Sequence, residues 1–183
     1  MVNFEFTKTD IQGLYVQNID YDLTYSSDNR GFFKYFYSQS EIAKVSSKKF
    51  NFQQGNHSFS KEGVLRGLHL ESWSKLVYVV SGKALIVVAD TRQDSRTFGK
   101  YVSIEVGDFD SGRKSVLIEE GLANSFYCFS DVHYLNNVSS EFDPNKRFGI
   151  KFDDPDLSIP WPNRDPILSD VDRNLPYLRD LLT

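Results

Sequence analysis

Three side chains with complementary chemistry lie close together in the stretch from Gly63 to Gly82: Arg66, His69 and Lys75. An imidazole titrates near neutral pH and can take up a proton, whereas a guanidinium or an ammonium group binds an anion. The β-prone pattern places Arg66 and His69 on one strand and Lys75 at the start of the next, and we expect the two strands to pair. The stretch therefore predicts a rigid site for an anionic ligand. A histidine buried for structural reasons is the alternative.

The spacing of this stretch resembles the first motif of metal-binding cupin barrels, G-x5-H-x-H-x3-E-x6-G. The marked positions are occupied here by Gly63, His69, Glu71, Lys75 and Gly82. Glu71 stands where the motif has its second histidine, and Lys75 replaces a carboxylate ligand with a cation that would repel a divalent metal. In the second cupin motif, Asn124 takes the place of the remaining histidine. The resemblance implies a cupin without a metal ion.

Length and composition favour one all-β domain over residues 1–183. Aromatic residues make up 15% of the chain, with 15 Phe and 10 Tyr, and β-branched residues are frequent, which favours strands. The formal net charge of -4 argues against a partner such as nucleic acid or a membrane surface. Any site for an anion must therefore be a local basic cluster.

The single cysteine, Cys128, excludes an internal disulfide and is typical of a protein from a reducing compartment. Its apolar neighbours indicate a buried core thiol. The N-terminus shows no signal-peptide pattern, and no apolar run approaches the roughly 18 residues of a membrane span. We expect a soluble, cytoplasmic protein.

Short strands follow one another with little helix between them. Besides the central stretch, strands are predicted over 13–19, 50–54, 75–81, 84–89, 101–106, 115–118, 126–129 and 132–138. Short helices are predicted over 38–47 and within 167–172. This spacing is typical of a sandwich or a barrel.

Four further residues are candidates for the site. Arg30 follows a turn-forming Asp28-Asn29 and should lie at the mouth of a strand, unless it is an ordinary solvated arginine. Gln54 and Asn56 could bind phosphate or sugar oxygens, although a polar strand edge explains them almost as well. Asp172 stands three residues after Ser169, as in a capping box, which would give it a structural role at a helix start.

Several separate segments resemble the dTDP-4-dehydrorhamnose 3,5-epimerase family in order and spacing. They are Phe52–Ser58, Gly63–His69, Asp90-Thr91-Arg92 with Thr97-Phe98-Gly99, Asp154-Pro155 with Trp161-Pro162, and Leu168–Asp172. The resemblance implies a homodimeric, metal-free cupin jelly roll with a few short helices, mainly at the C-terminus. It further implies an epimerase that inverts carbons beside the ketone of a nucleotide-linked 4-keto-6-deoxy sugar, without a cofactor.

Inversion beside a ketone needs a base for the C–H proton and a cation or donor for the enolate oxygen. His69 is a suitable base, and the resemblance implies that Asp172 orients it and that Lys75 faces the C4 oxygen. Arg30, Gln54, Asn56 and Arg66 match positions that in the family hold the pyrophosphate and neighbouring groups. An arginine fork suits phosphate oxygens.

The chain departs from the family where members that invert both carbons use a tyrosine as the acid. That position is Asn137 when counted from Asn124 and Asn136 when counted back from Pro144. An amide cannot replace a phenol as a proton donor. If Asn137 points inward, Tyr134 lies on the other face of its strand.

Asn124 replaces the family's second histidine, and Ile86 replaces an aspartate. We therefore expect an epimerase of a nucleotide-linked hexose or heptose, acting at C3, at C5 or at both. Asn124 and Asn137 line its site, and water or another residue returns the proton. The alternatives are a sugar 3,4-ketoisomerase and a catalytically silent protein that binds a sugar nucleotide. The resemblance suggests a role in making surface polysaccharide.

Overall fold

Two strands that are almost wholly apolar lie in the interior of two antiparallel sheets. The computed structural model describes residues 5–19, 25–46, 48, 50–109, 112–143 and 147–182. Strand β7 (Lys75–Ser81) lies inside a six-stranded sheet, and β8 (Lys83–Asp90) lies inside a five-stranded sheet. Both faces of each strand are covered, which explains why their apolar residues do not alternate with polar ones.

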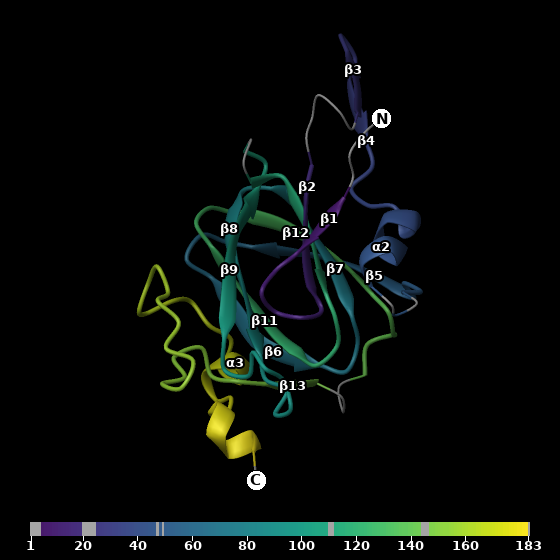
Figure 1. Cartoon of the computed structure of the whole chain (residues 1–183). Coiled ribbons are helices and arrows are strands. Elements are labelled where there is room, and N and C mark those ends of the chain that lie inside the picture. Colours follow the sequence, from purple (N-terminus) through teal and green to yellow (C-terminus); the bar gives the residue numbers. More distant parts are fainter. Residues whose placement is uncertain are drawn as a thin grey trace.

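The two sheets face each other as a jelly-roll sandwich (Figure 1). The six-stranded sheet has the order β1 (Phe6–Lys8), β2 (Leu14–Asn18), β10 (Lys114–Ile118), β7, β12 (Val132–Val138) and β5 (Gln54–Ser60). The five-stranded sheet has the order β13 (Arg147–Gly149), β6 (Leu65–Glu71), β11 (Leu122–Cys128), β8 and β9 (Tyr101–Gly107). The predicted all-β, cupin-like class is confirmed.

The expectation that the strands of His69 and Lys75 pair with each other is wrong. Strand β6 pairs with β11 and β13, whereas β7 pairs with β10 and β12. The link over 72–74 crosses from one sheet to the other. The side chains of His69 and Lys75 therefore come from opposite walls of the sandwich.

The predicted strand over 50–54 is also wrong, because β5 begins at Gln54 and continues through the polar segment to Ser60. Phe50 and Phe52 instead pack on the outer face of the six-stranded sheet, in the cluster around Ile42. Strand β5 forms the edge of that sheet, so in the described part of the chain its polar residues have one neighbouring strand, β12.

The short helices lie near their predicted positions. Helix α2 (Gln39–Val45) covers the outer face of the six-stranded sheet through Ile42. The C-terminal segment, which contains α3 (Asp170–Arg173) and the 3-10 helix η3 (Leu178–Leu181), follows the five-stranded sheet, where Leu178 packs on Leu68. Among the helices in the described ranges, none is long and apolar enough to cross a membrane.

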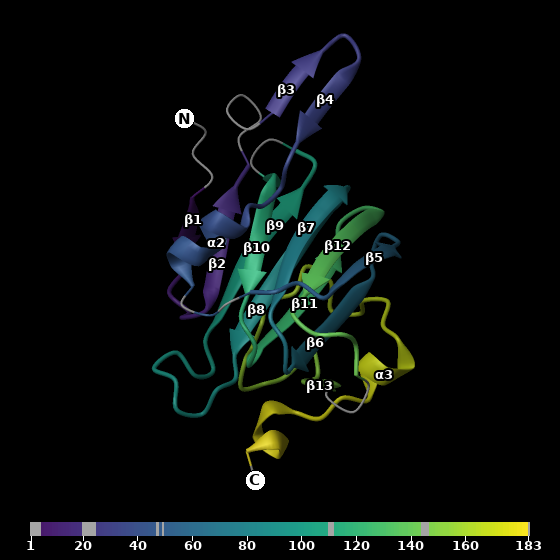
Figure 2. The ribbon, with the colours of Figure 1, turned by 90° about the vertical axis from the view of Figure 1, so that its right-hand side faces the viewer.

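A hairpin of β3 (Tyr25–Asp28) and β4 (Gly31–Lys34) projects from one end of the sandwich (Figure 2). Both views place it at the end remote from α3. The aromatic side chains of Phe32 and Phe33 on β4 are 59% and 72% exposed. Both aromatic rings are therefore mostly open to solvent in this chain.

Candidate functional site

His69 and Asp172 form a hydrogen-bonded pair although they are far apart in the sequence. The His69 Nε2 atom lies 2.7 Å from Asp172 Oδ1, and Asp172 is 3% exposed. An ionised carboxylate only accepts hydrogen bonds, so Nε2 carries the proton and Nδ1 carries the lone pair of the neutral imidazole. Asp172 thereby sets both the orientation and the tautomer of the ring.

The C-terminal segment reaches His69 because it is attached to the start of β6. The Leu65 N–H donates to the Ile167 carbonyl at 3.0 Å, and the Ile167 N–H donates to the Gly63 carbonyl at 2.9 Å. Ser169 then caps α3, its hydroxyl accepting from the Asp172 N–H at 3.1 Å. The cap uses the backbone of Asp172 and leaves its carboxylate for His69.

Alternation along β6 turns His69 and Glu71 toward the interior. Leu68 and Leu70 pack in the outer cluster under the C-terminal segment, so the residues between and beyond them face inward. Gly67 is required here because its φ is +111° and a Cβ atom would lie 2.6 Å from the Asn124 carbonyl. The close approach of β11 places Asn124 directly opposite His69.

Lys75 extends from the facing sheet and is only 5% exposed. Its Nζ atom donates to Asn124 Oδ1 at 2.6 Å and also contacts the carboxylate of Glu71. A buried ammonium ion needs such partners because its desolvation is costly. Asn124 thus connects the two walls, since it lies opposite His69 and accepts from Lys75.

A row of amides continues the interior surface along the sheet edge. Gln54 donates to Asn56 at 2.5 Å, and Asn56 donates to Asn136 on the neighbouring strand at 2.8 Å. Burial alternates along β5, with Gln54 and Asn56 less exposed than the residues between them. Both the polar-edge interpretation and a ligand-binding surface agree with this placement.

Arg66 stands beside this row on β6. Its Nε atom donates to the Ser60 hydroxyl at 2.8 Å, and Nη2 donates to the Phe59 carbonyl at 3.2 Å. Arg66, His69 and Asp172 all border a cavity of about 380 Å³ between β6 and the C-terminal segment. A guanidinium anchored in this way can bind an anion at the mouth of the site.

Two predicted site residues do not join the others. Asn137 pairs with Leu76, which packs against Ile42 of α2, so its side chain lies on the outer face of the sheet. Arg30 lies in the β3–β4 turn with its side chain 85% exposed, and its Nη2 atom contacts Asp28 at 2.5 Å. Asn137 was misplaced because the count from Asn124 crosses the loop between β11 and β12. Arg30 lies apart from the other residues because it belongs to the projecting hairpin.

The inward residue of the late strand is Asn136, and Tyr134 shares its face. Both the count back from Pro144 and the alternation of β12 give this result. The sequence reasoning missed Glu71 as the carboxylate partner of Lys75. Glu71 and Lys75 are four residues apart, on strands of different sheets, and this spacing does not by itself predict that their side chains are in contact.

In the described ranges, no three His, Cys, Asp or Glu side chains gather as a metal site would require. The charged groups of the interior are instead paired with each other. The interior thus combines an oriented imidazole, a buried ammonium ion and a row of amides between two walls.

The family model for dTDP-4-dehydrorhamnose 3,5-epimerase matches residues 8–180. The chain belongs to this family. A relative from Methanothermobacter thermautotrophicus, a dTDP-4-dehydrorhamnose 3,5-epimerase, is 34% identical over 98% of this chain and 97% of its own length. Family members of this name are epimerases, which are enzymes of the isomerase class.

Solved structures in the family have the same architecture. The Mycobacterium tuberculosis rmlC epimerase superposes with a TM-score of 0.89 at 31% identity, covering 97% of this chain and 90% of that one. ChmJ, a 3'-monoepimerase from Streptomyces bikiniensis in complex with dTDP-quinovose, gives 0.84 at 29% identity, covering 93% and 86%. An epimerase of one carbon is therefore among the similar folds.

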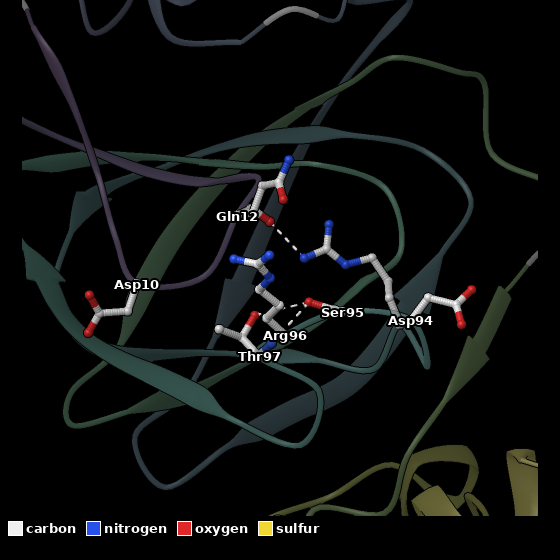
Figure 3. Close-up of a pocket in the computed structure, with 7 residues that line it drawn as sticks. Asp10, Gln12, Asp94, Ser95, Arg96 and Thr97 are labelled. Atoms are coloured by element: carbon white, nitrogen blue, oxygen red, sulfur yellow. Dashed lines mark hydrogen bonds between the residues drawn. The ribbon is translucent and has the colours of Figure 1, made fainter.

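One of the segments that resemble the family builds a different cavity, of about 550 Å³ (Figure 3). Figure 3 shows Gln12 beside the loop of Asp94–Thr97, whereas the carboxylate of Asp10 points away from it. Arg92 donates to the Gln12 carbonyl at 2.8 Å. No described residue lines both this cavity and the one at His69. The loop after β8 therefore contacts the N-terminal segment through the hydrogen bond between Arg92 and Gln12.

Asp90 holds that loop together. It is fully buried and accepts from Arg92 Nε at 2.8 Å, from the Ser95 hydroxyl at 2.5 Å and from the Thr97 hydroxyl at 2.6 Å. Burial by itself would raise the pKa of Asp90, but these hydrogen bonds outweigh it and lower the pKa to about 2. The carboxylate is therefore ionised and saturated with donors.

Proposed function

We propose that this protein inverts C3, C5 or both carbons beside the ketone of a dTDP-linked 4-keto-6-deoxy sugar. The observation that carries the proposal is the pairing of His69 with Asp172 on one wall while Lys75 extends from the facing wall. A sugar ring between the walls would meet a base on one side and a cation near its carbonyl oxygen.

His69 Nδ1 removes the proton of the carbon beside the ketone in this mechanism. The Asp172 carboxylate holds Nε2–H at 2.7 Å and stabilises the imidazolium that forms. The electrons of the C–H bond form an enolate, whose oxygen is stabilised by the Lys75 ammonium ion. Because Lys75 is buried, its charge acts in a medium of low dielectric, which strengthens its electrostatic attraction to the enolate oxygen.

Substrate binding falls to the polar row and to Arg66. Arg66 is a suitable partner for the diphosphate, because a guanidinium binds phosphate oxygens with two parallel hydrogen bonds. Gln54, Asn56 and Asn124 offer amide groups to hydroxyl and carbonyl oxygens of the sugar. These roles agree with the inward placement of all three amides.

C3 is the centre that we expect to be inverted. The interior of β12 carries Asn136 rather than a phenol at the position of the family's tyrosine, and the similar ChmJ is a 3'-monoepimerase. Without the tyrosine acid, we expect reprotonation to fail at one of the two carbons, C3 or C5, rather than at both.

The test is incubation with dTDP-4-keto-6-deoxyglucose in deuterated water, followed by proton NMR. We expect deuterium and inverted configuration at C3. Absence of deuterium from both C3 and C5, with each available 4-keto sugar nucleotide, would contradict the proposal. Movement of the carbonyl to C3 would identify a ketoisomerase, and tight binding of dTDP-sugar without exchange would identify a silent binding protein.

A homodimer is the expected assembly, and the exposed β3–β4 hairpin, which carries Arg30 in its turn, is the surface that we expect to take part in it. The aromatic hairpin projects from the end of the sandwich remote from α3 and exposes Phe32 and Phe33, whose burial against a second copy would stabilise a dimer. Light scattering after gel filtration tests this: a dimer mass is expected, and a monomer at micromolar concentration would contradict it. We place the enzyme in the cytoplasm because its cysteine, Cys128, is a buried free thiol.

A further inference from the structure

The chain has three histidines, and two of them, His57 and His133, lie together outside the interior that contains His69. Both point to the outer face of the six-stranded sheet, because their neighbours along each strand face inward. In the antiparallel pairing of β5 with β12, His57 lies opposite Leu135 and His133 lies opposite Phe59. The two histidines are therefore diagonal neighbours on one face.

The imidazole nitrogens of this pair are at a separation that suits a shared metal ion. His57 Nε2 lies 2.9 Å from His133 Nδ1. A transition metal ion binds an imidazole nitrogen at about 2.0–2.1 Å, so two nitrogens at this separation subtend about 90° at one ion. Adjacent ligands of an octahedral or square-planar ion stand at right angles, whereas a tetrahedral ion needs a wider angle. The pair therefore suits Cu²⁺ or Ni²⁺ better than Zn²⁺.

Both rings can offer a lone pair to such an ion. A neutral imidazole carries one N–H and one lone pair, and within the pair one nitrogen donates to the other. To bind an ion, the ring that donates moves its proton to its other nitrogen, and no proton is lost. In the described part of the chain, neither ring makes a second hydrogen bond that would oppose this change of tautomer.

The strands hold the two rings in a fixed relation. Strands β5 and β12 are paired along their whole length and lie side by side at the sheet edge (Figure 2). The His133 ring also contacts the ring of Phe59, with centroids 5.0 Å apart. The register of β12 against β7 shifts between His133 and Tyr134, and such irregularities redirect side chains. Ligands that are ordered before the ion arrives lose little conformational entropy when they bind it.

The pair is also accessible to an ion from solution. His57 is exposed and His133 is half-buried, and the apolar side chains of Phe59 and Val80 near them are each 47% exposed. A hydrogen bond between side chains at the surface competes with water, so the pair by itself contributes little to stability. An ion bound by both rings would instead connect the edge strand β5 to its neighbour β12.

We propose that His57 and His133 form a surface site for one divalent transition metal ion per chain. Cu²⁺ binds most tightly and Ni²⁺ follows, in the usual order for nitrogen ligands. The site is open: the chain supplies two ligands and water completes the coordination. It lies on the opposite face of the sheet from the catalytic interior, and epimerisation in metal-free buffer does not depend on it.

The test is a calorimetric titration with NiCl₂ of the full chain, without an affinity tag and after treatment with a chelator. We expect one Ni²⁺ ion per chain. His57→Asn and His133→Asn should each weaken binding by about 10-fold or more, since loss of even an outer partner of a metal ligand costs about 10–100-fold. Unchanged affinity in both variants would overturn the proposal.

His69→Asn is the matched control, because it removes the remaining histidine and leaves the outer pair in place. This variant should bind Ni²⁺ as the wild type does. A loss of affinity equal to that of His133→Asn would overturn the assignment, since the ion would then not distinguish the pair from a single imidazole.

The spectrum of bound Cu²⁺ gives a readout that does not depend on affinity. Electron paramagnetic resonance at one equivalent should show coupling to two imidazole nitrogens in the wild type and in His69→Asn. It should show at most one in His57→Asn, which changes an exposed residue of the edge strand and serves if His133→Asn does not fold. Identical spectra in wild type and His57→Asn would overturn the proposal.

Thermal unfolding supplies the last comparison. An ion that binds the folded state raises the melting temperature in proportion to the logarithm of its concentration above Kd. Saturating Ni²⁺ should therefore raise the melting temperature of the wild type and of His69→Asn more than that of either pair variant, and an equal rise in all four would overturn the site. A wild-type protein that binds Ni²⁺ but inverts no 4-keto sugar contradicts only the proposed function, because the two proposals rest on different faces of the sheet.

Discussion

Two buried aspartates in this molecule have opposite arrangements. All the donors that we describe for Asp90 come from its own loop, from Arg92 to Thr97. Asp172 instead meets an imidazole 103 positions away, on a strand of the sheet. A local carboxylate saturated by strong donors fixes a loop, whereas a long-range pair holds one titratable ring in a chosen orientation. The first arrangement serves stability, and the second serves chemistry.

The largest effect expected from this contrast is that of His69→Asn. Loss of the base should lower the epimerisation rate by about 10³-fold or more, and solvent exchange should fall with it. The melting temperature should change little, because His69 is not part of the apolar core. Proton NMR in deuterated water and thermal unfolding measure the two quantities.

His133→Asn is the control for this variant. His133 is also a strand histidine, but it contacts His57 on the outer face of β12 at 2.9 Å. Its replacement should leave the rate unchanged. A comparable loss of activity in both variants would show that the interior imidazole has no special role.

Asp172→Asn should have the next largest effect, a loss of about 10²-fold in kcat. An amide can donate to Nε2, which would favour the tautomer with the proton on Nδ1 and so remove the lone pair that acts as the base. The Ser169 cap survives because it uses the backbone N–H of residue 172. Steady-state kinetics would measure the loss. Asp170→Asn in the same helix is the control, and equal losses in both variants would contradict the assignment.

Much of the sandwich could be predicted because its strands follow from local patterns of apolar and polar residues. The apolar runs of β7 and β8, the Ser169 cap and the short helix around Ile42 all follow from neighbouring residues. What failed was the assignment of strands to sheets. Pairing of β6 with β7 seemed natural for consecutive strands, but the crossing over 72–74 is decided by packing between the sheets.

The candidate site shows the same division. Residues that were predicted to lie on one strand do so, as His69 and Arg66 do on β6. Asn137 was wrong because alternation of faces holds only within a continuous strand, and the loop after β11 breaks the count. Glu71 was missed because its contact with Lys75 depends on two walls meeting.

Asp90→Asn tests the other half of the contrast and should destabilise the fold by about 2 kcal/mol at pH 7. The pKa of Asp90 is lowered from 3.8 to about 2, so its contribution is complete above pH 4 and is lost as the pH falls toward 2. The difference between wild type and variant should therefore shrink at pH 3. Urea unfolding at both pH values measures it.

Asp94→Asn is the control in the same loop, since Asp94 is exposed and outside the Asp90 network. The rate of epimerisation per folded molecule should be unchanged in both variants. A selective loss of activity in Asp90→Asn would show that this carboxylate also serves the site, and the contrast with Asp172 would fail.

The smallest expected effect is that of Ser169→Ala. Ser169 affects both the stability of α3 and the position of Asp172, which orients His69. Loss of the cap costs α3 about 1 kcal/mol, and because α3 carries Asp172, kcat should fall by about 5-fold. The global unfolding free energy should barely change, since α3 is short and lies outside the core. Ser169→Asp retains a capping oxygen and should restore kcat. If Ser169→Ala loses as much activity as Asp172→Asn, then the Ser169 hydroxyl itself takes part in the reaction, and the cap is not its only role.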